Sequence, residues 1–341
     1  MAAAVLAAAA IGGGVYAWGE GALLPCGPVD RIVDLSSCRL VARFDDQDLA
    51  QMVLAPDGSL LAVSRQPGQA PARPQELLRI DPDSGVVRSR VGLAQVPPAA
   101  SWMAASVSPS GHSIAGVFLD GPIQVIDTGT GATRSPLRRG AAGLAFVSDD
   151  AIALDPGTTF WEIPDSAPFV SVADNGDLPA RKAAEVPGLF AKGVSTARTD
   201  GGTITAEHLE TRGDSGVIAI RLADAADGRP SGPLLTGALD VPTFVPGLQQ
   251  LLPELAFSPD GRRLAASFSM ADEWGRDTAA LFVWEVEDGR LLRRVPSKEA
   301  WRRLVWSPDS RGLFALRYTP DSWTEPVKTG VSELVRIEIG G

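Results

Sequence analysis

Short apolar runs separated by a Ser-Pro-Asp-Gly turn recur along this chain. The clearest copy is ELAFSPDGRRLAASFS, from Glu254 to Ser269, and related stretches begin at Gln51, Ala105 and Arg303. The apolar runs are too short for helices and are bounded by turn residues, which is the pattern of buried strands. Proline suits the second position of a β-turn, aspartate can bond back to the turn backbone, and glycine tolerates positive φ. Each copy therefore predicts a β-hairpin.

The hairpins repeat along the chain, although two copies are degraded. Six residues occupy the turn position: Pro56, Pro109, Ser148, Thr199, Pro259 and Pro308. Successive turns are about 40 to 60 residues apart, a period typical of propeller blades rather than of helical solenoids. Further apolar strands that end in an Asp/Gly turn follow the hairpins, as in LFVWEVEDGRLLRRV from Leu281. These predict the third and fourth strands of each blade.

The segments LAFSPDGRRLA and FVWEVEDGRLL resemble WD-repeat and TolB-like β-propellers, over roughly residues 38 to 341. The Trp-Asp dipeptide of the WD repeat is absent, with Trp284-Glu285 as the nearest approach, and the histidine that often precedes the first strand is also missing. The resemblance implies an all-β, divergent β-propeller of four-stranded blades. We expect six blades, with seven as the alternative, because TGALDVPTFVPGLQQLL before Pro259 has room for an extra strand pair.

The two ends of the repeat array predict how the ring closes. The last repeat supplies three strands and stops at ELVRIEIGG, whereas an extra apolar segment, Cys38 to Phe44, precedes the first hairpin. An open blade edge would invite aggregation. The family resemblance implies that the N-terminal segment closes the ring as the outer strand of the last blade.

The first residues of the chain indicate export. Residues 1–21 begin with eighteen uncharged and mostly apolar residues, which fits a signal peptide or a short membrane anchor. No Lys or Arg precedes them, and Ala and Gly are only mildly hydrophobic, so a flexible tail or a misplaced start is the alternative. We divide the chain into this segment, a lead-in at 22–37 and a propeller at 38–341. The expected location is periplasmic or extracytoplasmic, with anchoring in the inner membrane as one option.

The chain has two cysteines, Cys26 and Cys38, which lie just after the apolar segment. Cysteine pairs in exported proteins are usually oxidised, whereas cytosolic thiols stay reduced. We therefore expect a disulfide between them, and two unrelated buried thiols are the alternative. Two cysteines and two distant histidines make no metal-ligand cluster, so no metal or cofactor is expected.

Charge and motifs argue against several function classes. The net charge is −10 and the isoelectric point is near 4.8, which does not suit binding to nucleic acid. The arginine pairs in RRLVW, from Arg302, and LLRRV, from Leu291, are expected on solvated outer faces. GDSG at Gly213–Gly216 matches a serine-protease motif, but neither His112 nor His208 has the matching context of a catalytic base. We expect no enzymatic constellation, and His112 is interpreted as an exposed turn residue.

Loop length gives the only indication of a binding surface. The connections between the second and third strands are long in three repeats, at Gln66–Gln75, Ala271–Thr278 and Tyr318–Ser332. These repeats are consecutive in a closed ring of six blades, and long loops on a rigid scaffold often carry binding function. Drift in loop length is the alternative.

The expected partner-binding residues lie in two of these loops. Two are aromatic anchors and four form an acidic rim: Trp274, Trp323, Asp272, Glu273, Asp321 and Glu325. Tryptophan is enriched at interaction hot spots. The sequence therefore predicts a non-catalytic scaffold, exported or tethered to a membrane through its N-terminus, that binds a partner protein. The alternative is a propeller enzyme of hydrolase or dehydrogenase type, or a small-ligand-binding protein, that uses the central channel.

Overall fold

The computed structural model describes 18 segments of the chain: residues 38–45, 47–65, 74–98, 100–118, 122–137, 141, 143–155, 166–172, 177–182, 192–194, 196–199, 204–209, 216–224, 228–239, 249–271, 277–297, 301–320 and 330–339. Every regular element within them is a β-strand, and these strands form six sheets. The hairpin periodicity explains this content, because each copy of the repeat supplies paired short strands and no segment long enough for a helix.

The first three sheets each contain four consecutive antiparallel strands. Blade one consists of β2 (Asp48–Leu54), β3 (Leu60–Arg65), β4 (Gln75–Ile80) and β5 (Val87–Leu93). Blade two consists of β6 (Trp102–Val107), β7 (Ser113–Phe118), β8 (Ile123–Asp127) and β9 (Thr133–Leu137). Blade three consists of β10 (Gly143–Ser148), β11 (Ala151–Asp155), β12 (Ser166–Ser171) and β13 (Asp177–Lys182).

The other three sheets are more varied in their connections. Blade four consists of β15 (Thr196–Arg198), β16 (Ile204–Leu209), β17 (Val217–Asp224) and β18 (Leu235–Ala238). Blade five consists of β19 (Gln249–Phe257), β20 (Arg263–Ala271), β21 (Asp277–Glu285) and β22 (Leu291–Ser297), with the short β14 (Lys192–Val194) added beside β19. Blade six consists of β23 (Trp301–Trp306), β24 (Gly312–Pro320), β25 (Gly330–Glu338) and β1 (Cys38–Asp45).

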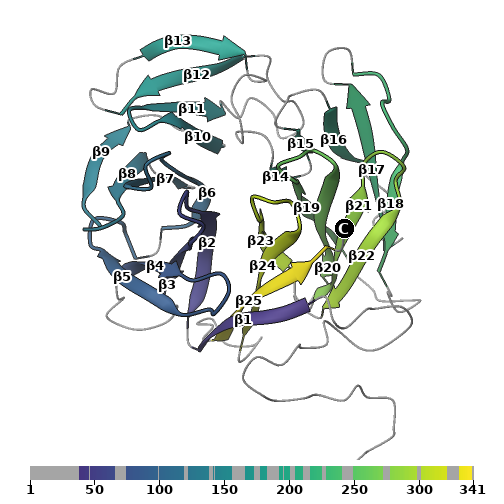
Figure 1. The fold of residues 1–341 in the computed structure, drawn as a ribbon, viewed down its shortest axis with the longest axis horizontal. Helices are drawn as coiled ribbons and strands as arrows, with labels where there is room; N and C mark the ends of the chain where they lie inside the picture. The colour runs from purple at the N-terminus through teal and green to yellow at the C-terminus, as the bar shows by residue number, and fades with distance from the viewer. Residues whose placement is uncertain are drawn as a thin grey trace, which may run out of the picture.

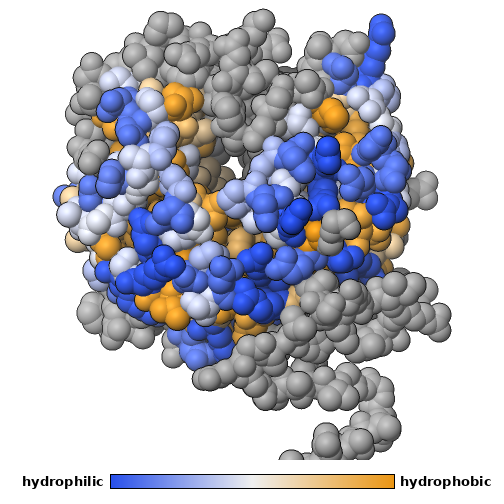
Figure 2. Space-filling model, viewed as in Figure 1, coloured by the Kyte–Doolittle hydropathy of each residue, from blue (hydrophilic) through white to orange (hydrophobic). Residues whose placement is uncertain are grey.

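The six sheets stand around a common centre in chain order, with the first strand of each hairpin innermost (Figure 1). The surface of this face mixes hydrophilic and apolar residues and is hollowed near the centre of the ring (Figure 2). The predicted class, an all-β propeller of four-stranded blades, is confirmed. In the described part of the chain the sheets number six, and the segment TGALDVPTFVPGLQQLL contributes β18 and the start of β19.

The Ser-Pro-Asp-Gly turns form because each side chain bonds to its own turn. In the copy between β19 and β20, Ser258 Oγ donates to Asp260 Oδ1 at 2.6 Å and accepts from the N–H of Arg263 at 2.9 Å. The N–H of Arg262 also donates to Asp260 Oδ1, at 3.1 Å, and Gly261 has a φ of 69°. The turn is therefore closed by its own hydrogen bonds, and only glycine adopts its backbone conformation without strain.

Ring closure occurs as predicted. β1 pairs antiparallel with β25, from Cys38 opposite Ile337 to Asp45 opposite Val331. The exposed edge of a three-stranded last blade is thereby covered by a strand from the other end of the chain. Cys38 is buried at the start of β1, packed in the cluster that joins blades five and six.

Tryptophan side chains connect neighbouring blades. Their indole N–H groups donate across blade boundaries: Trp102 to Gln75 Oε1 at 2.7 Å, Trp284 to the carbonyl of Thr236 at 3.0 Å, and Trp306 to the carbonyl of Ala256 at 3.0 Å. All three tryptophans are buried. Each combines a large apolar contact with a satisfied polar group, which fixes how one blade sits on the next.

Candidate functional site

The two faces of the ring are identified by where the strands begin and turn. Arg303, near the start of β23, reaches the carbonyl of Ala50 on β2 and that of Trp102 on β6, so the innermost strands of three blades begin at the same face. The second-to-third-strand connections return to this face, because strands within a blade are antiparallel. We call it the loop face.

The hairpin turns lie on the opposite face, which we call the turn face. There the N–H of Ser110 donates to Asp149 Oδ1 at 3.0 Å, which connects blades two and three. The N–H of Asp260 donates to Ser310 Oγ at 3.2 Å, which connects blades five and six. The uniform short turns are therefore part of the framework that holds the blades together.

The predicted partner-binding residues fall between described strands. Asp272, Glu273 and Trp274 lie between β20 and β21, and the other three, Asp321, Trp323 and Glu325, lie between β24 and β25; all six are outside the described residues. The strands that flank them end at the loop face, in the neighbouring blades five and six. The structure thus brings the anchor points of both connections to one face, and the roles of the side chains stay a prediction.

The three connections are shorter than the sequence indicated, because the strands extend further. Ala271 ends β20, and Tyr318 and Ser332 belong to β24 and β25. Ser332 Oγ accepts from the N–H of Leu49 at 3.0 Å, which connects blade six to blade one. The expected boundaries of these loops were therefore wrong by one to three residues where they differ from the strands.

Gln75, which the sequence placed at the end of the first long loop, is a buried structural residue. It begins β4, and its Nε2 donates to the carbonyls of Pro97, Pro98 and Ala100 at 3.2, 3.1 and 2.9 Å. Together with the bond from Trp102, this amide joins blade one to the start of blade two. Gln75 therefore belongs to the support of the loop face rather than to a binding surface.

Arg303 corrects the expectation that the arginine pair in RRLVW lies on a solvated outer face. It lies on the innermost strand of blade six, within a β-bulge where the register of β23 against β24 shifts between Arg302 and Val305. Its φ is 55°, in the left-handed region that non-glycine residues rarely adopt. The bulge turns the side chain toward the centre of the ring and removes two backbone N–H groups from the ladder.

One arginine thereby connects four blades. Arg303 Nε donates to the carbonyl of Ala50 in blade one at 2.8 Å, and Nη2 donates to the carbonyl of Trp102 in blade two at 3.1 Å. The freed N–H groups of Arg303 and Leu304 donate to the two carboxylate oxygens of Glu254 in blade five, at 2.8 and 2.9 Å. Bulges also interrupt β2, β6 and β19, so irregular backbone from four blades meets here.

The surroundings of Arg303 mix charges of both signs. Burial lowers the pKa of its guanidinium. The carboxylates of Glu254 and Asp48 raise that pKa and so offset part of the effect of burial. Asp48 is buried and forms an ion pair with Arg65 at 2.5 Å. Arg302 and Met103, next in sequence to the residues of this junction, are exposed. The arrangement suits a structural junction with a polar and partly apolar rim.

The chemistry available for catalysis is dispersed over the described residues. His112 is exposed beside a hairpin turn of blade two, as predicted, whereas His208 is buried in β16 of blade four. Over the described ranges no three His, Cys, Asp or Glu side chains are grouped so that they could hold a metal ion. The same part of the chain contains no helix of sufficient length and hydropathy to cross a membrane. Residues 1–37, which include Cys26, are not among the described residues, so the disulfide and the export segment stay predictions.

Sequence reasoning missed Arg303, Glu254 and Gln75. Two of the three carried a visible indication, since Arg303 and Glu254 are charged residues within apolar strands of the repeat. Nothing in the sequence marks the bulge that orients Arg303. Gln75 follows a proline-rich stretch that predicts a loop, so the sequence did not indicate that its side chain is buried.

Comparison with known proteins concerns the fold. No family model matches the chain, and no curated protein matches its sequence. Among solved structures, the WD40 repeats of RRP9 superpose with a TM-score of 0.52 at 12% identity, covering 89% of this chain and 98% of that one. The β-propeller domain of Cps50 (Swd1) from Myceliophteria thermophila gives a TM-score of 0.43 at 12% identity, covering 88% and 100%. The resemblance to TolB-like propellers stays a prediction. The chain thus has the fold of WD-repeat β-propellers, in a divergent form without the Trp-Asp dipeptide.

Proposed function

We propose that this chain is a non-catalytic scaffold that binds a partner protein on its loop face. The observation that carries the proposal is the junction at Arg303, which ties blades five, six, one and two together at that face. The strands that flank the three long connections belong to blades five, six and one, which this junction joins. A rigid platform beneath long loops is the arrangement on which binding function concentrates.

The expected chemistry of the interface follows from the six loop residues. Trp274 and Trp323 would supply the buried contact area, and the four carboxylates around them would attract a basic partner surface. Charged rims mainly raise association rates and make them sensitive to salt, whereas aromatic anchors carry most of the affinity. We therefore propose a partner with a basic rim around an apolar pocket, in a periplasmic or extracytoplasmic compartment.

The alternative, an enzyme or small-ligand protein that uses the central channel, is less well supported. On the loop face, the guanidinium of Arg303 donates to the carbonyls of two other blades, Ala50 in blade one and Trp102 in blade two. The nearby carboxylates of Glu254 and Asp48 are already engaged by backbone N–H groups and by Arg65. These groups are committed to holding the ring, which favours the scaffold.

The first prediction tests the loop face by mutation. Partners recovered by crosslinking from the extracytoplasmic membrane surface would be purified and titrated against wild type, Trp274→Ala and Trp323→Ala. Each substitution is expected to cost about 2 kcal/mol of binding, roughly thirtyfold in Kd, because anchors of this type dominate interfaces. The melting temperature should change little, since loop tips contribute little to a core.

The matched control is Val86→Ala, which removes an exposed apolar side chain from the short turn between β4 and β5. It should leave affinity unchanged. A partner whose affinity ignores both tryptophans, or falls equally in the Val86→Ala variant, would contradict the proposal.

A further inference from the structure

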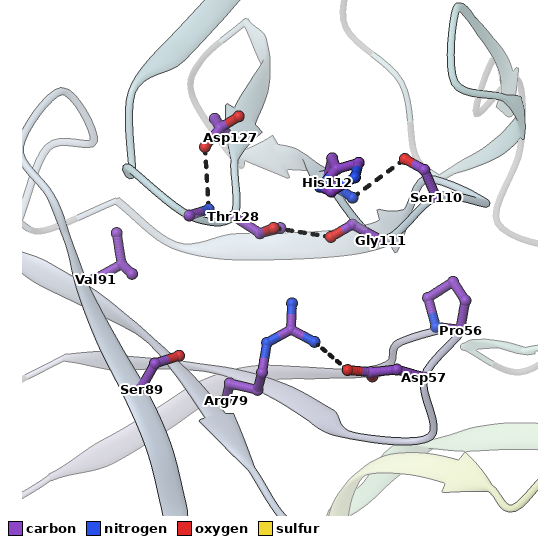
Figure 3. Close-up of a pocket in the computed structure, with 11 residues that line it drawn as sticks. Pro56, Asp57, Arg79, Ser89, Val91, Ser110, Gly111, His112, Asp127 and Thr128 are labelled. Carbon is purple, nitrogen blue, oxygen red and sulfur yellow. Dashed lines mark hydrogen bonds and ion pairs between the residues drawn. The ribbon is translucent and has the colours of Figure 1, made fainter.

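A pocket of about 440 Å³ lies between blades one and two on the turn face. Blade one contributes Asp57, Arg79 and Ser89 to its lining, and blade two contributes Ser110, His112 and Thr128 from its turns (Figure 3). No part of the proposed scaffold function uses these residues.

Close backbone contacts between the two blades border the pocket. A Cβ added to Gly131, whose φ is 73°, would lie 2.2 Å from the carbonyl oxygen of Gly92, so a side chain there is excluded. A Cβ on Gly111 would lie 3.5 Å from Pro56 Cδ, in ordinary contact. The N–H of Thr133 also donates to Gln95 Oε1 at 3.0 Å across the boundary. The blades are thus fixed against each other around the pocket, which is a built feature of their packing.

Arg79 presents a free hydrogen-bonding edge to this pocket. Its Nη1 donates to Asp57 Oδ2 at 2.7 Å and to Ser59 Oγ at 2.9 Å, and the side chain is half-buried. Within the described residues, Nε and Nη2 donate to no acceptor, and Figure 3 shows the guanidinium rising from blade one toward the turns of blade two. The Nε–Nη2 edge of a guanidinium carries two parallel N–H groups that match the two oxygens of a carboxylate or phosphate.

The two carboxylates that line the pocket are held by their own turns. Asp57 Oδ1 accepts from the N–H and the hydroxyl of Ser59, and these bonds, with Arg79, hold the pKa of Asp57 below its usual value despite an opposing effect of burial. Asp127 Oδ1 accepts from the N–H groups of Gly129 and Thr130 at 3.0 and 2.9 Å. Both acids therefore support the turns of their own blades, and Arg79 is the cationic lining residue with a hydrogen-bonding edge directed into the pocket.

Among its aspartate and arginine side chains, Asp57 and Asp127 against Arg79, the pocket lining has one excess negative charge. This charge disfavours a doubly charged phosphate more than a singly charged carboxylate. The hydroxyls of Ser89 and Ser110 lie at the exposed rim, and Val91 supplies an apolar wall for a short carbon chain.

We propose that this pocket binds a carboxylate group, which pairs with the Nε–Nη2 edge of Arg79. The carboxylate belongs either to a small organic acid or amino acid, or to an acidic side chain or C-terminus of a peptide. In both cases the carboxylate pairs with Arg79 in the same way. The two sources differ in the rest of the ligand, which must fit between the hydroxyls of Ser89 and Ser110 and the side chain of Val91.

Calorimetric titration of the whole chain tests this assignment with four probes: acetate, glutamate, a short peptide with a free C-terminus, and inorganic phosphate. We expect a carboxylate probe to bind with a Kd on the order of 1 mM or tighter, and more tightly than phosphate. Arg79→Lys keeps the positive charge but removes the two parallel N–H donors of the guanidinium edge, and it should weaken carboxylate binding about tenfold. The control Arg88→Lys alters an exposed arginine paired with Asp81 outside the pocket and should bind as wild type.

A second variant separates ligand binding from folding, because Arg79 also supports the turn at Asp57. Ser89→Tyr, directly opposite Arg79 in the register of β4 and β5, fills the exposed rim while Arg79 and Asp57 keep their own side chains. It should abolish binding while the melting temperature stays near that of wild type. Tighter binding of glutamate than of the peptide assigns a small-molecule site, and the reverse assigns a peptide site. No binding by any carboxylate probe, binding unaffected by Arg79→Lys, or a preference for phosphate would overturn the proposal.

Discussion

At the scale of single residues, the Ser-Pro-Asp-Gly motif is explained by side chains that close their own turn. Between β23 and β24, Ser307 Oγ donates to Asp309 Oδ1 at 2.5 Å and accepts from the N–H of Gly312 at 2.8 Å. The Ser307 hydroxyl, with the N–H of Arg311, holds the pKa of Asp309 below its usual value of 3.8. The same pair of bonds closes the corresponding turn of blade five, between β19 and β20.

The second prediction follows from the lowered pKa of Asp309. A carboxyl whose pKa is lower in the folded state contributes stability above its unfolded pKa, near 3.8, and this contribution is lost as the pH falls through the folded pKa. Asp309→Asn removes the charge, so its melting temperature should lie slightly below that of wild type at neutral pH, and the gap should narrow as the pH is lowered to about 3.

The same thermal scans in a Ser307→Ala background provide the control. The Ser307 hydroxyl is the main cause of the lowered pKa of Asp309. Without it, the melting-temperature difference between Asp309 and its asparagine variant should depend less on pH. A gap of constant size across the pH range would show that Asp309 does not act through its charge.

The third prediction concerns Arg303. Arg303→Ala removes the hydrogen bonds to Ala50 and Trp102 and is expected to lower the free energy of unfolding by about 2 kcal/mol. Arg303→Gly loses the same bonds but relieves the strain of a φ of 55°, so it should be about 1 kcal/mol more stable than the alanine variant. Denaturant unfolding of both variants measures the difference.

The relative free energies of unfolding of the wild type, the alanine variant and the glycine variant show what Arg303 contributes. If the alanine variant were as stable as wild type, the guanidinium would make no net contribution and the junction would not hold the ring. If glycine were less stable than alanine, the left-handed backbone conformation would not be a source of strain.

At the scale of elements, the closing strand β1 joins the two ends of the propeller. The fourth prediction is that deletion of Cys38 to Phe44 leaves β25 with an unpaired edge and exposes the apolar cluster around Ile337 and Leu334. Exposed strand edges promote aggregation. We expect the truncated chain to aggregate or to show a large fall in melting temperature, measured by light scattering and thermal unfolding.

Deletion of residues 1–37 is the matched control for that experiment, because it removes a longer segment and keeps β1. It should leave a soluble protein that melts cooperatively. If the chain without Cys38 to Phe44 melted like this control, ring closure would not depend on β1.

Elements governed by local sequence could be predicted, and those that depend on distant pairing could not. The hairpins around Pro259 and Pro308 carry their own turn chemistry, so strand and turn positions follow directly from the residues. β14 is different, because its three residues pair with β19 across more than 50 positions of sequence. The bulge that orients Arg303 has the same character, since the bonds that stabilise it come from Glu254 and Ala50 in other blades.

At the scale of the whole molecule, the two faces of the ring perform separate tasks. The strands that flank the long connections end at the loop face, where the Arg303 junction lies, and the turn face carries the pocket at Arg79. The two proposals can therefore fail independently. Loss of partner binding in the tryptophan variants would leave carboxylate binding intact, and Arg79→Lys should leave partner binding intact.

The last prediction concerns the cysteines and the compartment in which the ring works. Cys38 is buried at the start of the closing strand, opposite Ile337 on β25. A disulfide to Cys26 would fasten the lead-in segment to this strand and would stabilise the fold by roughly 3 kcal/mol through the short loop that it closes. Such a bond forms and persists in an oxidising compartment.

Thiol labelling of the exported protein measures this directly. Because Cys38 is buried, the protein is denatured without reductant before a maleimide is added, so that burial cannot be mistaken for oxidation. We expect no labelled cysteine before reduction and two afterwards, whereas Cys26→Ala should leave Cys38 labelled and lower the melting temperature. The same chain made in a reducing cytosol serves as the control and should label twice. Two labelled cysteines in unreduced exported protein would exclude the disulfide and, with it, remove the main support for an extracytoplasmic scaffold.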